Sequence, residues 1–286
     1  DRHFSVCEHF GIEMVNVGMT PEGPDMDAVR RLAESDRSVK GIWCVPQYSN
    51  PQGYTYSDRV VDAFAALRPA APDFRIFWDN AYTVHHLGAA HDHVKNILEA
   101  CRRAGHGDMV YMFASTSKIT FPGAGVAMLG ASRANVEFIK KQLKAQTIGP
   151  DKLNQLRHVR FFQNFAGIQA HMKRHAALIK PKFDAVVALF RQNFAGTGIA
   201  EWTEPKGGYF ISFNTPDGCA RRTVALCGEA GVKVTPAGAT FPYHRDPRDR
   251  NIRIAPTYPP IGELKTAIEL FCLCVKLAAV EKRLAR

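Results

Sequence analysis

The sequence MVYMFASTSK, residues 109–118, joins a short apolar run to a polar turn that ends on a lysine. A short apolar run rich in aromatic and branched side chains, bounded by polar residues, is typical of a buried β-strand. Two similar runs come earlier in the chain, GIWCV at residues 41–45 and FRIFW at residues 74–78, and polar residues follow each of them. The three runs therefore predict three strands of one sheet with polar side chains after their ends.

Helical patterns separate these strands, at residues 24–32, 57–67 and 92–104, with Ser57 as the expected N-cap of the second helix. Strands that alternate with helices predict a parallel sheet covered on both faces. We also expect a strand at residues 11–17, and the run at residues 125–130 to close the series. Ligands of such sheets bind at the carboxyl ends of the strands, so the polar residues found there are candidates for a site.

The second part of the chain has a different pattern. Residues 134–194 look helical, with breaks expected at 149–150 and near Gly167. The expected strands and helices that follow lie at residues 201–203, 208–213, 217–230, 232–234, 251–255 and 261–284. We therefore predict a large α/β domain with interdomain helices over residues 1–164 and a small α+β domain over residues 165–286.

The composition indicates an ordinary globular enzyme, with 46% hydrophobic and 22% charged residues. The net charge is +10, but the basic residues are scattered, so solvated helix faces explain them better than nucleic acid, and anionic substrates come second. Neither a membrane span nor a signal peptide is visible. An odd number of cysteines, seven, favours reduced thiols and a cytoplasmic protein.

Four polar residues follow the three predicted strands: Asn50, Asp79, Tyr82 and Lys118. A lysine at a strand end has the partly buried setting that Schiff-base chemistry with a pyridine aldehyde requires. A carboxylate such as Asp79 can keep the pyridine nitrogen protonated, so that the ring accepts electrons. An amide and a phenol can hydrogen-bond a ring oxygen. Taken singly, each of the four is better explained as an ordinary surface, turn or half-buried residue.

Three more residues are candidates for binding anions. Ser115 and Ser117 offer hydroxyl and backbone N–H groups next to the lysine, where a phosphate would lie. Arg253 interrupts an apolar strand and would be satisfied by a bidentate grip on a substrate carboxylate, or by a structural ion pair. The histidines at 85, 86, 91 and 93 have no accompanying cluster with metal-ligand spacing, so we interpret them as loop and cap residues and predict no metal site.

The order of these motifs resembles that of the fold-type I aminotransferases dependent on pyridoxal phosphate. The series is Asn50-Pro51-x-Gly53, Asp79-x-x-Tyr82, Ser115-x-Ser117-Lys118 and then an arginine in a late strand. It is most similar to the class I/II, aspartate-aminotransferase-like branch, and KGGYF at residues 206–210 also matches a family segment. The resemblance covers essentially the whole chain. It implies a three-layer αβα large domain, as in other PLP transferases, and a smaller α+β C-terminal domain.

The resemblance also implies roles for the candidate residues. Lys118 would form the Schiff base and shuttle the proton, and Asp79 would pair with the pyridine nitrogen. Asn50 and Tyr82 would contact the ring oxygen. Ser115 and Ser117 would bind the phosphate, and Arg253 would bind the substrate carboxylate. The implied reaction moves an amino group between an amino acid such as aspartate and a 2-oxo acid, in a homodimer.

Two departures from the family pattern leave alternatives open. The family usually places an arginine on the cofactor phosphate shortly after the lysine, where this chain has Gly125. The glycine-containing phosphate loop and the aromatic ring that stacks on the cofactor would lie before the first residue, so we expect an N-terminally incomplete large domain. A lyase of the same fold, an aminotransferase-like ligand-sensing domain of a transcription regulator, and an inactive homologue are the alternatives.

Overall fold

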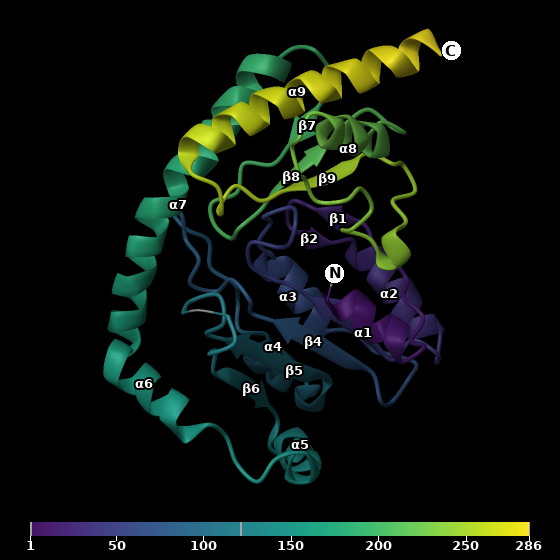
Figure 1. Cartoon of the computed structure of the whole chain (residues 1–286). Helices are drawn as coiled ribbons and strands as arrows, with labels where there is room; N and C mark the ends of the chain where they lie inside the picture. The colour runs from purple at the N-terminus through teal and green to yellow at the C-terminus, as the bar shows by residue number, and fades with distance from the viewer. Residues whose placement is uncertain (1, 121, 286) are drawn as a thin grey trace.

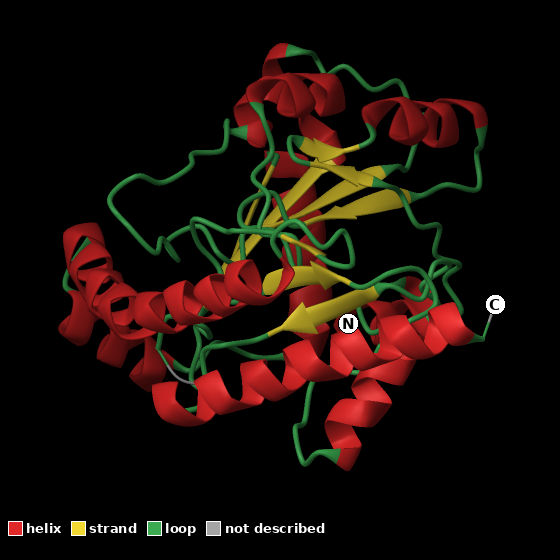
Figure 2. Ribbon diagram, turned by 90° about the horizontal axis from the view of Figure 1, so that it is seen from above, coloured by secondary structure: helices red, strands yellow, loops and turns green. Residues whose placement is uncertain are grey.

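The computed structural model describes residues 2–120 and 122–285 (Figure 1). In chain order the helices, 3-10 helices (η) and strands are α1 (Arg2–His9), β1 (Met19–Thr20), β2 (Gly23–Pro24), α2 (Met26–Ser35), β3 (Gly41–Cys44), α3 (Asp58–Ala65), β4 (Arg75–Asp79), α4 (Ile97–Arg103), η1 (Gly107–Met109), β5 (Val110–Ser115), β6 (Ala127–Ala131), α5 (Arg133–Gln146), α6 (Lys152–Phe162), α7 (Phe165–Phe194), β7 (Glu201–Trp202), β8 (Ile211–Asn214), α8 (Ala220–Glu229), η2 (Pro242–His244), β9 (Asn251–Ile254) and α9 (Ile261–Leu284). Figure 2 shows the strands in the middle of the molecule with most helices outside them.

The N-terminal part contains a four-stranded sheet in the order β3-β4-β5-β6. The first three strands are parallel, as predicted, so their carboxyl ends lie at the same edge. The prediction that β6 continues this parallel series is wrong, because β6 runs antiparallel to β5. A parallel return usually runs through a helix, and the described residues between β5 and β6 form none.

One face of this sheet is buried by the helices between the strands. Ile76 and Trp78 of β4 pack with Val61 and Phe64 of α3 and Ile97 of α4 in one core cluster. The Ser57 side chain accepts the Val60 N–H, which confirms the predicted N-cap. Since successive side chains of a strand point to opposite faces, the intervening residues emerge on the other side.

The opposite face of the sheet carries a row of aromatic rings. Trp43, Phe77 and Phe113 lie nearly parallel to one another, with centroids 5.7–6.5 Å apart. The ring of His3, from α1, stacks on Trp43 at 5.1 Å, yet Trp43 keeps 43% of its surface exposed. Polar groups at the carboxyl ends of the strands therefore lie next to an apolar surface.

The C-terminal part contains an antiparallel sheet of β7, β8 and β9. Phe190 of α7, Phe213 of β8 and Phe271 of α9 lie at the centre of its core, with ring centroids 4.8–6.0 Å apart. The first half of α7 packs elsewhere, since Met172 joins a cluster with Val84 and Ile119. The helix α7 thus contributes to two cores, and the domain boundary between residues 164 and 165 stays a prediction.

Two expected strands are not strands in the structure. Residues 11–17 and 232–234 are irregular, and Ile12 and Val15 are more than half exposed. A strand needs a neighbour to take up its backbone hydrogen bonds, and neither segment has one within the described chain. The two expected breaks between helices are present, between α5 and α6 around residues 149–150 and between α6 and α7 at residues 163–164. Gly167 itself lies in the first turn of α7, where its N–H donates to the Asn164 cap. No helix of the described residues is long and apolar enough to cross a membrane.

Candidate functional site

Lys118 lies in a tight turn directly after β5. The carbonyl of Thr116 accepts the N–H groups of Ile119 and Thr120, at 2.9 and 2.8 Å, which folds the chain back immediately after the strand. The lysine Nζ donates to the Tyr82 hydroxyl at 3.1 Å and lies 4.3 Å from the centroid of the Tyr82 ring. Two of the candidate residues named from the sequence, Lys118 and Tyr82, are thus in direct contact in the folded chain.

Asp79 is the last residue of β4, next to β5 in the sheet, and it pairs in register with Phe113. Burial raises the pKa of its carboxyl, and the nearby Lys118 charge opposes that shift. Burial likewise lowers the pKa of the Lys118 amine, against the opposing effect of Asp79. Both pKa values are therefore displaced towards the neutral forms, which is typical of two groups held in one partly desolvated site.

Arg253 reaches this cluster from the C-terminal sheet. Its Nη1 donates to Asn50 Oδ1 at 3.3 Å, across 203 positions of sequence, and its guanidinium lies 4.7 Å from the Phe210 ring centroid. Burial lowers the pKa of Lys118, and the positive charge of Arg253 lowers it further. Burial raises the pKa of Tyr82, and the charge of Arg253 opposes that shift. The structure thus brings Asn50, Asp79, Tyr82, Lys118 and Arg253 into one electrostatically coupled group.

The two serines and Gly125 lie on the other side of the lysine turn. The Ser117 N–H donates to Ser115 Oγ at 3.1 Å, and Ser117 is exposed. A Cβ atom added at Gly125 would collide with Ser117 Oγ and would lie 2.8 Å from Ser117 N and 2.9 Å from its Cα. The main chain at 125 is therefore packed against the lysine turn, and an arginine cannot be accommodated there without moving that turn.

We expect Gly125→Ala to destabilise the chain by about 1–3 kcal/mol, the usual cost of overpacking. The added methyl group must displace the Ser117 backbone, so the free energy of unfolding measured with denaturant should fall. Gly149→Ala is the matched control, because a Cβ atom there meets nothing within 4 Å. Equal free energies of unfolding for the two variants would show that the lysine turn can move to admit the methyl group without loss of stability.

The sequence interpretation missed several residues that hold this turn. His85 Nε2 lies 3.2 Å and Tyr209 Oη 2.7 Å from the Lys118 carbonyl oxygen. His171 Nε2 lies 2.9 Å from the Ile119 carbonyl, and His158 Nε2 lies 2.7 Å from Thr116 Oγ1. His85 lies in a loop, as expected, but its contact with the lysine turn was not foreseen. The match of the KGGYF segment to the family was the sequence feature that could have indicated Tyr209. The residues around the histidines contain no pattern that predicts these contacts.

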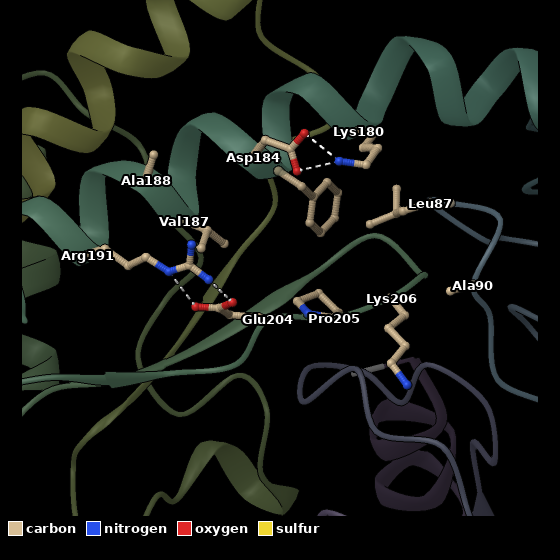
Figure 3. A pocket seen from close by; sticks show the side chains of 12 residues that line it. Leu87, Ala90, Lys180, Asp184, Val187, Ala188, Arg191, Glu204, Pro205 and Lys206 are labelled. Carbon is tan, nitrogen blue, oxygen red and sulfur yellow. Dashed lines mark hydrogen bonds and ion pairs between the residues drawn. The ribbon is translucent and has the colours of Figure 1, made fainter.

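A metal centre has no donor set in the described residues, which contain no group of three histidine, cysteine, aspartate or glutamate side chains able to hold an ion. The cavity in Figure 3, of about 460 Å³, is also separate from the lysine cluster. It lies beside α7, with Phe183 and Pro205 in its wall and ion pairs Lys180–Asp184 and Arg191–Glu204 around it. Lys118, Asp79 and Arg253 are not among the described residues that line it.

Comparison with protein families gives one match over the whole chain. The family model described as "Aspartate amino-transferase" matches residues 1–286. Among curated proteins, one named as an aminotransferase in Mycolicibacterium smegmatis is 49% identical over 281 residues. The aspartate aminotransferase of Corynebacterium glutamicum is 44% identical over 281 residues. These alignments cover 98% of this chain but 66% and 65% of the two relatives, so the chain spans slightly less than two thirds of their length.

Solved structures show the same similarity in three dimensions. The crystal structure of an aspartate transaminase from Corynebacterium glutamicum superimposes with a TM-score of 0.96 at 44% identity, over 98% of this chain and 66% of that one. An α-aminoadipate aminotransferase from Thermus thermophilus, at 20% identity, superimposes with a TM-score of 0.77 over 94% of this chain and 66% of that one. The more distant structure supports the fold alone.

Proposed function

The chain belongs to the aspartate aminotransferase family, and from that premise we propose that it contributes the catalytic lysine site of a pyridoxal-phosphate-dependent aminotransferase. The proposed reaction moves an amino group from an amino acid such as aspartate to a 2-oxo acid. One observation carries the proposal: Asp79 and Lys118 lie at the carboxyl ends of neighbouring parallel strands, and the charge of each shifts the pKa of the other. The name of the Corynebacterium glutamicum relative supports aspartate as the first substrate to test.

The residues present suit this cofactor. The cluster offers the cofactor an amine, a carboxyl, a phenol and an amide, from Lys118, Asp79, Tyr82 and Asn50. Ser115 and Ser117 would hold the phosphate from the lysine turn. When bound, pyridoxal phosphate supplies an aldehyde for attachment to the lysine and a ring that accepts electrons. Gly125 supplies no cation, so the phosphate charge must be met by groups other than a side chain at 125.

Each residue of the chain then has a defined task. Burial favours the neutral form of the Lys118 amine, which is the form that acts as a nucleophile and that takes a proton from the substrate α-carbon. Asp79 would pair with the protonated ring nitrogen, whose positive charge would favour the ionised carboxylate against its desolvation. Arg253 exchanges its contact with Asn50 for a bidentate grip on the substrate carboxylate.

The relatives reported above are named as aminotransferases, which favours amino transfer over the lyase and ligand-sensing alternatives. A homodimer and a cytoplasmic location stay predictions, as does the assignment of individual site residues.

The test is to mix the chain with pyridoxal phosphate and then with L-aspartate and 2-oxoglutarate. We expect near-ultraviolet to visible absorption of the bound cofactor and glutamate that forms only when the oxo acid is present. Ammonia or pyruvate released without an oxo acid would indicate a lyase. Cofactor or amino acid bound without turnover would favour a ligand-sensing role.

A further inference from the structure

The main-chain carbonyl of Lys118 receives two side-chain hydrogen bonds from distant parts of the chain. His85 Nε2 lies 3.2 Å and Tyr209 Oη 2.7 Å from the carbonyl oxygen. They come from 33 and 91 positions away in the sequence. Side-chain hydrogen bonds to a loop carbonyl fix a backbone that strand pairing no longer holds. The carbonyl in question belongs to the residue whose amine is proposed to do the chemistry.

The protonation state of His85 follows from its partner. A carbonyl oxygen only accepts, so Nε2 carries the hydrogen, and Nδ1 has no hydrogen-bond partner among the described residues. The residue is buried, and burial lowers the pKa of His85 to about 4. The imidazole is therefore neutral at pH 7 and held in a single tautomer.

Tyr209 is tied to His85 as well as to Lys118. The Gly208 N–H donates to the His85 carbonyl at 2.9 Å, and Leu87 N–H donates to the Lys206 carbonyl at 2.9 Å. This pairing requires glycine: Gly208 has φ +80°, and a Cβ atom at Gly207 would collide with the Tyr48 ring. Residues 85–87 and 206–209 are therefore held side by side by backbone hydrogen bonds. Each segment provides one donor, His85 or Tyr209, to the Lys118 carbonyl.

The rings of these residues also support one another. Tyr82, His85 and Tyr209 pack edge to face, with centroids 5.0–5.9 Å apart. Tyr82 accepts the lysine Nζ, while the other two bind the lysine carbonyl. This cluster of three rings therefore contacts Lys118 at two points, its main-chain carbonyl and its side-chain amine.

We propose that His85 and Tyr209 are positioning residues, which fix the carbonyl of Lys118 and so hold its amine over Tyr82 in the reaction proposed above. The predicted effect on turnover rests on the proposed function, whereas the predicted effect on the position of the amine does not. A displacement of about 1 Å at a reacting group can cost roughly 10²-fold in rate. Because the two donors share one acceptor, each partly substitutes for the other, and the double variant should lose more than the product of the single losses.

The first experiment needs no cofactor. The pH dependence of acylation of Lys118 by acetic anhydride, read by peptide mass spectrometry, reports the amine pKa in the free chain. We expect Tyr209→Phe and His85→Leu to move the midpoint upward, towards that of an ordinary lysine, because a freed amine is better solvated. The double variant should move it furthest. His85→Gln, which keeps an N–H donor, should restore the original midpoint in part.

The second experiment measures turnover of the same variants with pyridoxal phosphate bound. Loss of one neutral hydrogen bond should lower kcat about fivefold, with KM for the amino acid unchanged because Arg253 is untouched. Tyr111→Phe is the matched control, since that hydroxyl donates to Asn135 Oδ1 at 3.5 Å and, within the part of the chain that the structure describes, does not hydrogen-bond the lysine turn. It should change neither the acylation midpoint nor kcat.

The outcomes separate the two proposals. If Tm falls in the double variant while the acylation midpoint and kcat stay at their original values, His85 and Tyr209 only stabilise the fold and the inference is overturned. If the unmodified chain neither absorbs with pyridoxal phosphate nor transfers amino groups, the proposed function fails. The acylation profiles then still decide whether the two residues place the amine.

Discussion

Lys118→Ala is expected to abolish the covalent adduct that borohydride traps between pyridoxal phosphate and this chain, and to lower amino transfer by about 10²–10⁴-fold, the range for loss of a general acid–base. The substitution removes both the nucleophile and the group that moves the proton. Among the described residues, its Nζ makes one hydrogen bond, to the Tyr82 hydroxyl, so little stability should be lost. Peptide mapping of the reduced protein locates the adduct, and coupled spectrophotometry gives the rate.

Lys140→Ala is a suitable control for this prediction. Lys140 lies on α5 in an exposed ion pair with Glu137, so its removal should leave both the adduct and the rate unchanged. An adduct that survives in Lys118→Ala would show that another lysine binds the cofactor. A loss of the adduct together with unfolding, monitored by circular dichroism, would instead assign Lys118 a structural role.

Arg253→Gln is expected to lower kcat/KM for an amino acid by roughly 30- to 5,000-fold, as follows from the 2–5 kcal/mol typical of a buried charge contact. The guanidinium is the cation that reaches the lysine cluster from β9, and glutamine keeps a polar group without the charge. The adduct with Lys118 should persist. Arg253→Lys should recover only part of the loss, because an ammonium cannot grip a carboxylate in the bidentate manner.

The sharpest measurement for Arg253 compares two substrates. The variant should discriminate far less than the parent chain between an amino acid and the corresponding amine without a carboxylate. Arg248→Gln is the control, since Arg248 pairs with Asp217 on the surface and should not affect this ratio. An unchanged preference for the carboxylate in Arg253→Gln would place its binding elsewhere.

The local pattern predicted the elements that depend on local interactions. Ser57 caps α3, and the parallel strands β3, β4 and β5 end where the apolar runs end. Because parallel strands present their carboxyl ends at one edge, this also predicted that Asp79 and Lys118 would meet. The resemblance added Arg253 to the same group. In each case a short segment contains the pattern that allows the prediction: an apolar periodicity, a capping residue or a strand end.

The failures share a different cause. Residues 11–17 have a strand-like pattern but no described strand beside them, and β6 pairs antiparallel with β5 without a crossover helix in the described residues between them. The room at Gly125 depends on how closely the chain returns to Ser117. Each depends on what lies opposite the segment in space, which its own residues do not specify.

The sequence by itself determined which residues are the candidates for the chemistry, because a carboxyl, an amine and a guanidinium group at the ends or in the interior of apolar strands form a pattern only when they are taken together. Only the tertiary structure decided how these groups are held. The donors to the Lys118 carbonyl, His85 and Tyr209, and the contact of Arg253 with Asn50 join segments far apart in the chain. Hydrogen bonds and burial act over a few ångströms of space, whatever the separation in sequence.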